Sequence, residues 1–332
     1  MSVRPVVVIT EGCAAEPLAW LKERADVREL TPDAPGFAAA LAEAEALVVR
    51  TYTQVNDALL ERCPRLKVVG RGGVGLENID VAACRRRGVE VVYTPDANTR
   101  AVAEFVFGAM LRLVRPWGEF PPQGYTPLEF KQTRDTQAGR QLDELTLGVL
   151  GLGRVGRRVA QIGAVGFGMN VLFHDIAPVE VNDPLTFKAQ RVDFDELLRR
   201  SDIFTLHADA RPGNRHLLNA RTLARLKPGA MVINTARGEL LDAVALAEAL
   251  RRGHVSAAAI DVFDPEPPPP DCPLLGLPNV LLTPHMAART RTALTNMSWV
   301  VKDVWTVLSG GVPRFPAPGD GPPSHGPASG PA

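Results

Sequence analysis

Residues 147–156 read Leu-Gly-Val-Leu-Gly-Leu-Gly-Arg-Val-Gly, and they decide the fold of the second half of the chain. The apolar run Leu147–Leu150 is typical of a buried strand, and the pattern Gly-x-Gly-x-x-Gly begins directly behind it. In such a pattern Gly151 permits a tight turn, Gly153 lets the backbone approach a pyrophosphate, and Gly156 allows a helix to pack tightly on the strand. The stretch therefore predicts a dinucleotide-binding turn, with the phosphates at the N-terminus of the following helix.

An acidic residue stands where the next expected strand ends. Residues 171–175 read Val-Leu-Phe-His-Asp, so Asp175 closes a second apolar run about twenty residues beyond the glycines. Its carboxylate can accept hydrogen bonds from both hydroxyls of an adenosine ribose, whereas a 2′-phosphate would meet a negative charge. No arginine follows in Ile176-Ala177-Pro178. We therefore predict NAD rather than NADP as the cofactor.

The rest of the chain alternates short β-branched runs with helical patterns, in two series. The strands expected in the first series are Val6–Ile9, Ala46–Val49, Lys67–Val69 and Val89–Val92, with helices at Pro17–Arg24, Val55–Arg62 and Ile79–Arg87. The second series comprises Leu147–Leu150, Asn170–Phe173, Ile203–Leu206, Met231–Asn234, Ala258–Val262 and Val280–Leu282, with helices that include Val155–Val165 and Ala243–Arg251. Strands that alternate with helices indicate a parallel sheet covered on both faces, so we predict an α/β protein with two doubly wound domains.

Three further segments join or follow these series. The apolar residues of Asn98–Val114 recur at helical spacing, which predicts a long amphipathic helix. The Pro- and Gly-containing stretch 117–144 is expected to be an ordered connection with one short helix at Pro127–Gln137. Arg289–Leu308 is expected to form a closing helix. The tail from Gly310 to Ala332 is mostly Gly, Pro, Ser and Ala, cannot bury a core, and is expected to be disordered.

Composition excludes several classes of protein. Lys plus Arg number 37 and Asp plus Glu number 37, so the net charge is zero and binding of nucleic acid by bulk charge is excluded. No apolar run approaches the roughly 20 residues of a membrane span. The four cysteines are far apart and form no CxxC pair, which predicts free thiols in a reducing cytoplasm and no metal site.

Three chemically useful side chains follow three successive strands of the second series. Arg237 stands in Asn-Thr-Ala-Arg-Gly, Glu266 in Asp-Val-Phe-Asp-Pro-Glu-Pro, and His285 in Thr-Pro-His. Ligands of an open α/β sheet bind at the carboxyl ends of its strands. Arginine is a forked, permanently charged clamp for a carboxylate, and histidine can carry a proton near neutral pH. Each residue alone could be structural, but together they predict a catalytic site.

Several motifs in this order resemble the NAD-dependent D-isomer-specific 2-hydroxyacid dehydrogenases over about residues 3–310. The matching pieces are residues 70–80, Asn98-Thr99 with Val102-Ala103-Glu104, the glycine loop, residues 234–238, Asp261–Pro267 and Thr283-Pro284-His285. The resemblance implies a discontinuous, flavodoxin-like substrate domain of residues 1–99 and 288–310. It also implies a Rossmann NAD-binding domain of residues 100–287, and a homodimer built around the cofactor domains.

The resemblance also implies roles for individual residues. Arg237 would bind the substrate, His285 would be the acid/base and Glu266 its partner, in hydride transfer between NAD(H) and a small 2-hydroxy or 2-oxo acid. Val74 and Gly75 would hold the substrate carboxylate by their backbone amides. Positions implied to contact the cofactor are Thr99, Arg154, Val155, Asp175, His207, Thr235, Ala236, Arg237, Asp261 and His285. The Asp261 carboxylate could accept a hydrogen bond from the carboxamide of the nicotinamide.

Two branches of the family compete for the finer assignment. Residues 132–139 and 147–175 are similar to the C-terminal-binding corepressor branch, which predicts as an alternative an NAD-sensing interaction protein. Residues 50–53 and 70–72 are similar to the phosphoglycerate dehydrogenase branch, where Arg50 and Arg71 could bind a second acidic group of the substrate. Arg50 could equally be a surface charge at a strand end. The identity of the 2-hydroxy acid stays open.

Overall fold

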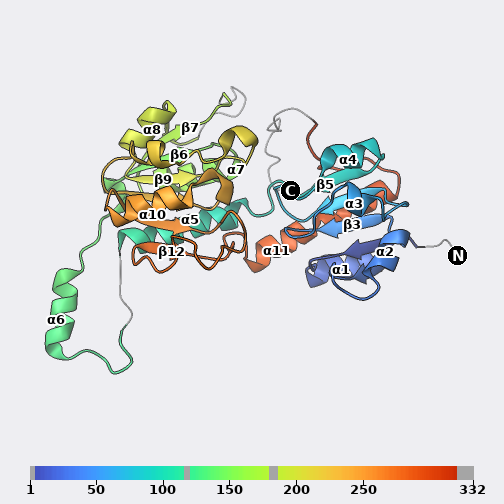
Figure 1. Cartoon of the computed structure of the whole chain (residues 1–332), viewed down its shortest axis with the longest axis horizontal. Coiled ribbons are helices and arrows are strands. Elements are labelled where there is room, and N and C mark those ends of the chain that lie inside the picture. Colours follow the sequence, from blue (N-terminus) through green and yellow to red (C-terminus); the bar gives the residue numbers. More distant parts are fainter. Residues whose placement is uncertain (1–3, 116–119, 179–185, 320–332) are drawn as a thin grey trace. The chain divides into compact units, whose positions relative to one another are not determined.

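The computed structural model describes residues 4–115, 120–178 and 186–319, which form two compact units (Figure 1). Unit 1 comprises Met1–Asn98 and Ala288–Ala332, and unit 2 comprises Thr99–Ala287. Among the described residues, no helix combines the length and the apolar character needed to cross a membrane.

Unit 1 is built on a parallel sheet of five strands in the order β2-β1-β3-β4-β5, which is the flavodoxin order. The strands are β1 (Val6–Ile9), β2 (Asp26–Glu29), β3 (Ala46–Val49), β4 (Val68–Arg71) and β5 (Glu90–Tyr93). The helices are α1 (Ala15–Lys22), α2 (Phe37–Glu43), α3 (Asp57–Leu60), α4 (Val81–Arg86), α11 (Arg291–Ser298) and α12 (Val300–Leu308). The sheet is buried between two apolar clusters, one completed by α2, α3 and α4 and the other by α1 and α12.

The closing segment of the chain returns to unit 1, as the resemblance implied. It forms two helices rather than one: α11 ends at Ser298 and α12 begins at Val300, with a turn at Trp299, where ψ is 0°. Val304 of α12 packs so closely on β4 that a Cβ at Gly70 would overlap it. The returning helix therefore leaves no room for a side chain at residue 70, which explains the glycine there.

The first part of the tail after α12 contradicts the disorder that was predicted for Gly310–Ala332. The described part, up to Gly319, pairs with β5: Pro316 forms an antiparallel bridge with Val92, and the amide of Ala317 donates to the carbonyl of Val91 at 2.6 Å. The composition argument failed here because the backbone of an edge strand offers partners whatever the side chains are. Residues 320–332 lie outside the described residues, as do 117–119 of the expected connection.

Unit 2 contains a parallel sheet of seven strands in the order β12-β11-β10-β9-β6-β7-β8. The strands are β6 (Thr146–Leu150), β7 (Asn170–His174), β8 (Gln190–Arg191), β9 (Ile203–Leu206), β10 (Ala230–Asn234), β11 (Val255–Ile260) and β12 (Val280–Leu282). Counted from β6, the first six strands have the Rossmann order 3-2-1-4-5-6, and β12 adds a seventh. The strand order reverses between β6 and β9, which is where an open α/β sheet binds its ligand.

Helices cover both faces of this sheet. They are α5 (Thr99–Val114), α7 (Arg154–Gln161), α8 (Phe194–Arg200), α9 (Ala220–Leu223) and α10 (Ala243–Arg251), whereas α6 (Pro127–Thr136) has no buried residue. Short 3₁₀ turns lie at Leu142–Glu144, Pro212–Asn214 and Gly238–Leu240, and a π-helical turn at Ile162–Gly166 extends α7. One buried cluster unites α5 and α7 with the sheet, and a second unites α8, α9 and α10 with it.

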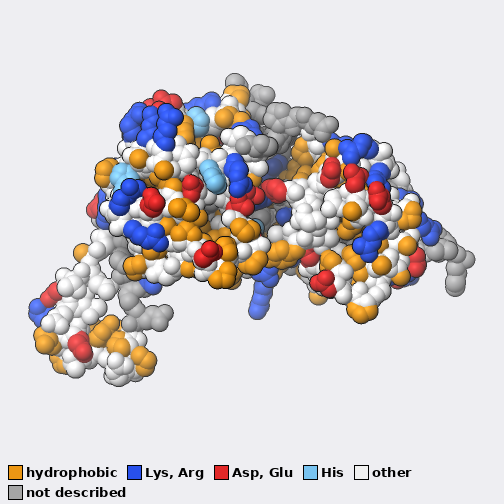
Figure 2. All heavy atoms as spheres, in the orientation of Figure 1, with side chains coloured by type: hydrophobic (Ala, Val, Ile, Leu, Met, Phe, Trp, Pro, Cys, Tyr) orange, Lys and Arg blue, Asp and Glu red, His pale blue; other side chains and the backbone are white. Residues whose placement is uncertain are grey.

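Residues 120–140, which we call the arm, stand away from the sheet of unit 2 (Figure 1). The arm contains α6, whose N-terminus is closed by a reciprocal capping box between Thr126 and Glu129, and none of the helix residues is buried. Phe120, Leu128 and Phe130 are respectively 67%, 64% and 49% exposed. Hydrophobic side chains are visible on the surface of the arm (Figure 2). The predicted short helix is therefore present, and it carries unusually exposed aromatic groups.

Candidate active site

The glycine loop has the geometry that a pyrophosphate requires. Gly151 directly follows β6 and has a φ of +89°. A Cβ at this position would press against the backbone of His207, which follows β9. A Cβ at Gly156 would overlap the carbonyl of Gly151. Gly153 is the N-cap of α7, and nothing lies within 4 Å of where its Cβ would be. The amides of Arg154 and Val155 have no acceptor inside the helix. These donors therefore lie beside the open space at Gly153, where a phosphate could accept from them.

Asp175 stands directly beside this loop. Its Oδ2 accepts a hydrogen bond from the amide of Leu152 at 2.5 Å, and its Oδ1 accepts one from the amide of Ala177 at 2.8 Å. Each carboxylate oxygen has two acceptor sites, so both retain capacity for a ribose hydroxyl. The carboxylate and the glycine loop together fit the adenosine ribose and the pyrophosphate of NAD.

Two of the remaining predicted cofactor positions follow strands at the same edge of the sheet. Thr235 follows β10, and its buried hydroxyl has no hydrogen-bond partner among the described residues, which fits a position that meets a ligand. His207 follows β9 and contacts Thr205 Oγ1 at 3.0 Å through Nε2. Although the residue is half-buried overall, desolvation lowers the pKa of His207 to about 3, so its ring stays neutral. Thr99 is the first residue of α5.

The turn that carries Arg237 is held by hydrogen bonds of Asn234 and by a close backbone contact at Gly238. Asn234 closes it by donating from Nδ2 to the carbonyl of Arg237 at 2.9 Å and accepting from the amide of Ala236 at 3.1 Å. A Cβ on Gly238 would overlap the backbone of Phe263. The glycine therefore allows the Arg237 turn to lie directly against the loop that leads to Glu266.

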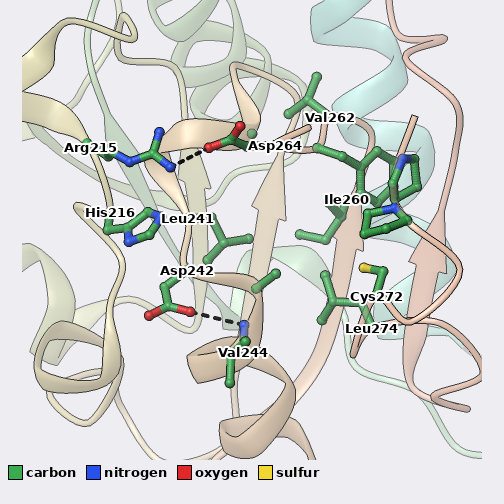
Figure 3. A pocket seen from close by; sticks show the side chains of 15 residues that line it. Arg215, His216, Leu241, Asp242, Val244, Ile260, Val262, Asp264, Cys272 and Leu274 are labelled. Carbon is green, nitrogen blue, oxygen red and sulfur yellow. Dashed lines mark hydrogen bonds and ion pairs between the residues drawn. The ribbon is translucent and has the colours of Figure 1, made fainter. Parts of the chain in front are cut away.

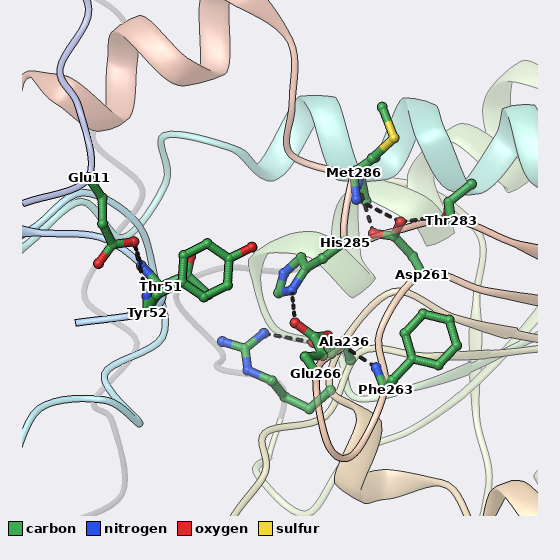
Figure 4. A network of polar contacts seen from close by, with 12 residues as sticks. Glu11, Thr51, Tyr52, Ala236, Asp261, Phe263, Glu266, Thr283, His285 and Met286 are labelled. Carbon is green, nitrogen blue, oxygen red and sulfur yellow. Dashed lines mark hydrogen bonds and ion pairs between the residues drawn. The ribbon is translucent and has the colours of Figure 1, made fainter. Parts of the chain in front are cut away.

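Glu266 and His285 form a hydrogen-bonded pair, with 2.9 Å between Oε2 and Nδ1, and their side chains point toward one another (Figure 4). Burial alone would raise the pKa of Glu266. The hydrogen bonds from His285 and from the amide of Phe263, together with the charges of His285 and Arg237, outweigh burial and hold that pKa below its usual value. Glu266 is therefore a carboxylate near neutral pH, and all three predicted catalytic residues interact.

His285 lies in a turn held by Asp261. The backbone of His285 is left-handed, with a φ of +53°, an uncommon conformation for a residue other than glycine. The Asp261 carboxylate accepts from Thr283 Oγ1 at 2.6 Å, from the amide of Met286 at 2.7 Å and from the amide of Ala287 at 2.8 Å (Figure 4). The expected bond to a nicotinamide carboxamide would add to these contacts. The structure shows in addition that Asp261 fixes the turn of the histidine.

A cavity of about 240 Å³ is lined in part by the loop after β11, including Asp264 and Pro268 (Figure 3). Its lining is apolar at Leu241, Ile260 and Leu274, and Arg215 pairs with Asp264 at 2.8 Å at its edge. This ion pair attaches the beginning of the loop to the segment that follows β9. Glu266 does not line the cavity, so the cavity is separate from the His285 pair.

In unit 1, Arg50 follows β3 and is half-buried rather than a fully exposed surface charge. Burial lowers the pKa of Arg50, and the positive charge of Arg289 lowers it further. The backbone at Arg50 is held by Glu11, whose carboxylate accepts from the amides of Arg50, Thr51, Tyr52 and Thr53 at 2.6–3.3 Å (Figure 4). Burial would raise the pKa of Glu11, but these backbone hydrogen bonds lower it overall. Arg50 thus begins a turn whose backbone is held by Glu11, and the charge of Arg289 acts on it.

The other expected substrate residues of unit 1 are Arg71 at the end of β4 and two residues of the loop that follows. Arg71 donates from Nη1 to the carbonyl of Gly72 at 3.0 Å, and its guanidinium lies where a Cβ of Gly73 would be. Gly73 has a φ of +148° and leads into the loop residues Val74, which is 37% exposed, and Gly75. The backbone amides expected to hold a carboxylate therefore lie in a partly exposed, glycine-rich turn.

Sequence reasoning missed two positioning residues, Glu11 and Gly238. Glu11 precedes its four donors by about 40 positions, and nothing local marks it as their acceptor. Gly238 could have been found, because a glycine directly behind a functional arginine at a strand end is a sign of close backbone approach.

Comparison with known proteins identifies the family. Residues 107–287 match the model described as D-isomer specific 2-hydroxyacid dehydrogenase, NAD binding domain. The chain is 42% identical over 253 residues to D-3-phosphoglycerate dehydrogenase of Methanocaldococcus jannaschii, a match that covers 76% of this chain and 47% of the relative. It is 37% identical over 253 residues to hydroxypyruvate reductase of Thermotoga maritima, covering 76% of this chain and 80% of that one.

A solved structure of similar fold is that of D-lactate dehydrogenase from Aquifex aeolicus, complexed with NAD and lactic acid. Its TM-score is 0.76 at 30% identity, with 92% of this chain and 96% of that chain covered. The chain belongs to the D-isomer specific 2-hydroxyacid dehydrogenases and contains their NAD-binding domain. It spans about half the length of the phosphoglycerate dehydrogenases that it matches. These relatives favour a dehydrogenase over the corepressor-like alternative.

Proposed function

We propose that the protein is an NAD-dependent oxidoreductase that interconverts a D-2-hydroxy acid and a 2-oxo acid. The observation that carries the proposal is the His285–Glu266 pair, 2.9 Å apart and within the field of Arg237, at the sheet edge that also bears the glycine loop. A proton carrier, a cation and a dinucleotide cradle are the three parts that such a reaction needs.

The protein's own contribution to the reaction is proton transfer and charge stabilisation. The glycine loop and Asp175 would hold NAD(H), which would supply a hydride to the 2-oxo acid or accept one in the reverse direction. Because Nδ1 of His285 is bonded to Glu266, Nε2 is the nitrogen that gives its proton to the oxygen at C2. Glu266 holds the ring in this orientation and stabilises its protonated form. In oxidation, Nε2 of the neutral ring removes the hydroxyl proton.

Arg237 binds the substrate carboxylate and stabilises the negative charge that develops on the oxygen at C2. The turn around Arg237 is fixed by Asn234 and Gly238, so the backbone that carries the guanidinium has a defined conformation. A positive charge that is already in position needs little reorganisation as the reaction proceeds.

We further propose that unit 1 contributes to substrate binding, with Val74 and Gly75 serving a carboxylate through their amides. Arg50 and Arg71 are proposed to serve a second acidic group, such as a phosphate. What supports this role for Arg50 is its half-buried position, its cationic neighbour Arg289 and its preorganised turn. The substrate class is then a small 2-oxo or 2-hydroxy acid, with doubly anionic acids preferred.

We propose a cytoplasmic homodimer. The four cysteines are free thiols, which supports a reducing compartment. The arm offers an exposed aromatic cluster, in which the ring of Phe120 lies 4.8 Å from that of Tyr125 and 6.4 Å from that of Phe130. A second copy of the chain is the partner that would bury this cluster, in line with the dimer that the family resemblance implies.

The test is oxidation of NADH at 340 nm against glyoxylate, hydroxypyruvate and phosphohydroxypyruvate. We expect turnover, with the largest kcat/KM for the phosphorylated acid. His285→Ala should lower kcat by about 10²–10⁴-fold while NADH binding stays nearly intact, because His285 acts on the substrate oxygen. A variant that keeps more than half of the wild-type kcat would contradict the assignment.

A further inference from the structure

The structure brings an arginine to the ribose end of the cofactor site that the local sequence after Asp175 does not contain. The short strand β8 pairs in parallel with β7, with Arg191 opposite Phe173. Two residues after Phe173, the chain reaches Asp175 and turns. The side chain of Arg191 therefore comes from a neighbouring strand, 16 positions away in sequence, to the same turn.

The Arg191 guanidinium is anchored on this turn by one nitrogen. Its Nη2 donates to the carbonyl of Asp175 at 2.6 Å and to the carbonyl of Ala177 at 3.1 Å. The side chain is otherwise exposed, and it forms no ion pair with a carboxylate of the described residues. Arginine has five N–H donors, and those on Nε and Nη1 have no acceptor among the described residues. Anchored in this way, the cation has little freedom to lose when it binds an anion.

The carboxylate of Asp175 belongs to the same turn. It accepts from the amides of Leu152 and Ala177, so both charged groups are attached to one short piece of backbone. Asp175 suits ribose hydroxyls and opposes a phosphate, whereas a guanidinium suits a phosphate. The turn thus carries one group that favours ribose hydroxyls, Asp175, and one that favours a phosphate, Arg191.

We propose that Arg191 forms a subsite for a phosphate on the 2′ position of the adenosine ribose. The proposal rests on the proposed use of NAD by this domain, and it goes further because it assigns the phosphorylated cofactor a specific partner. Asp175 suppresses the subsite in the natural protein by charge repulsion. Removing that single charge exposes the subsite, without any new arginine at residue 176.

The test uses the full chain and two probes, 5′-ADP and 2′,5′-ADP, whose binding is measured by calorimetry. In Asp175→Asn we expect the affinity for 2′,5′-ADP to rise at least about 10-fold relative to that for 5′-ADP, since hydrogen bonds between charged groups are strong. In Asp175→Asn with Arg191→Gln this gain should be lost, and with Arg191→Lys part of it should remain. The ratio of kcat/KM for NADPH and NADH should follow the same order.

The control variant is Arg221→Gln, which removes the same charge from α9. That helix packs on α10 rather than near β8, so combined with Asp175→Asn it should keep the gain. The proposal is overturned if the gain persists without Arg191, or if no variant favours 2′,5′-ADP. It is also overturned if Arg191→Gln weakens both probes equally, because Arg191 then only holds the turn. Nucleotide binding needs no turnover, so a failure of the proposed reaction would leave these results readable.

Discussion

The charge on Glu266 is the residue-scale feature with the clearest consequence for catalysis. His285 must carry a proton for reduction, and the carboxylate at 2.9 Å holds the orientation of the ring. The pKa of Glu266 lies below its usual value, so this carboxylate stays charged across neutral pH. In Glu266→Gln we expect kcat/KM for reduction to fall by about 10-fold, because an ionic hydrogen bond contributes at least about 1.4 kcal/mol.

The measurement is kcat/KM for 2-oxo acid reduction at pH 7. Asp264→Asn is the matched control, because Asp264 is in the same loop and pairs with Arg215 rather than with His285. The control should leave kcat/KM nearly unchanged. An unchanged kcat/KM in Glu266→Gln would remove the carboxylate from the proton-transfer proposal.

Asp261 shows how a single buried side chain can define the geometry of a functional one. Its side chain and backbone together bind Thr283, His285, Met286 and Ala287, so the left-handed conformation at His285 is surrounded by fixed groups. Such a conformation costs about 1–3 kcal/mol and persists only where its surroundings over-determine it. The histidine is therefore held in place before any substrate arrives.

At the scale of elements, the contact between the turn after β10 and the loop after β11 depends on Gly238. A Cβ at this position would overlap the backbone of Phe263, which cannot yield without moving the loop. We expect Gly238→Ala to destabilise the protein by about 1–3 kcal/mol and to lower kcat/KM, since the Glu266 loop would shift away from Arg237. Thermal unfolding and steady-state kinetics measure the two effects.

Gly108→Ala is the matched control for this substitution. Gly108 is an exposed residue of α5, and nothing lies within 4 Å of where its Cβ would be. Alanine there should leave kinetics unchanged and should stabilise the helix by about 0.5–1 kcal/mol. If Gly238→Ala also left kinetics unchanged and did not destabilise the protein, the close approach of turn and loop would not matter for catalysis.

The two series of elements and their parallel sheets could be predicted, because strong apolar runs alternate with helical periodicity. β2 was missed because only one of its four residues, Val27, is apolar. β8 was missed because Gln190-Arg191 is exposed and is a strand only through its pairing with β7. The three predicted catalytic residues could be found from their positions after successive strands. Glu11 and Arg191 could not, since their roles arise from pairing between distant segments.

At the scale of the whole molecule, the arm determines the expected assembly. Phe120 and Phe130 expose large apolar areas that a second copy would bury, and the buried area is the main driving force of association. We expect the natural protein to be a dimer by light scattering. Phe120→Ser with Phe130→Ser should shift it to a monomer, while circular dichroism stays unchanged.

Val312→Ser provides the control, because Val312 is 90% exposed, apolar and outside the arm. It should leave the dimer intact. A monomeric natural protein, or an arm variant that remains dimeric, would contradict the proposal that the aromatic cluster is buried in a dimer interface.

The pairing of the tail with β5 has a consequence for aggregation. β5 is an edge strand of the sheet of unit 1, and an uncovered edge is a template on which a foreign strand can add. Phe315 and Ala317 occupy backbone groups of Tyr93 and Val91, and proline at 316 offers no amide to the outside. Arg85 fastens the same stretch by donating to the carbonyls of Ala317 and Pro318. A proline-rich stretch that buries little surface thus blocks growth of the sheet at this edge.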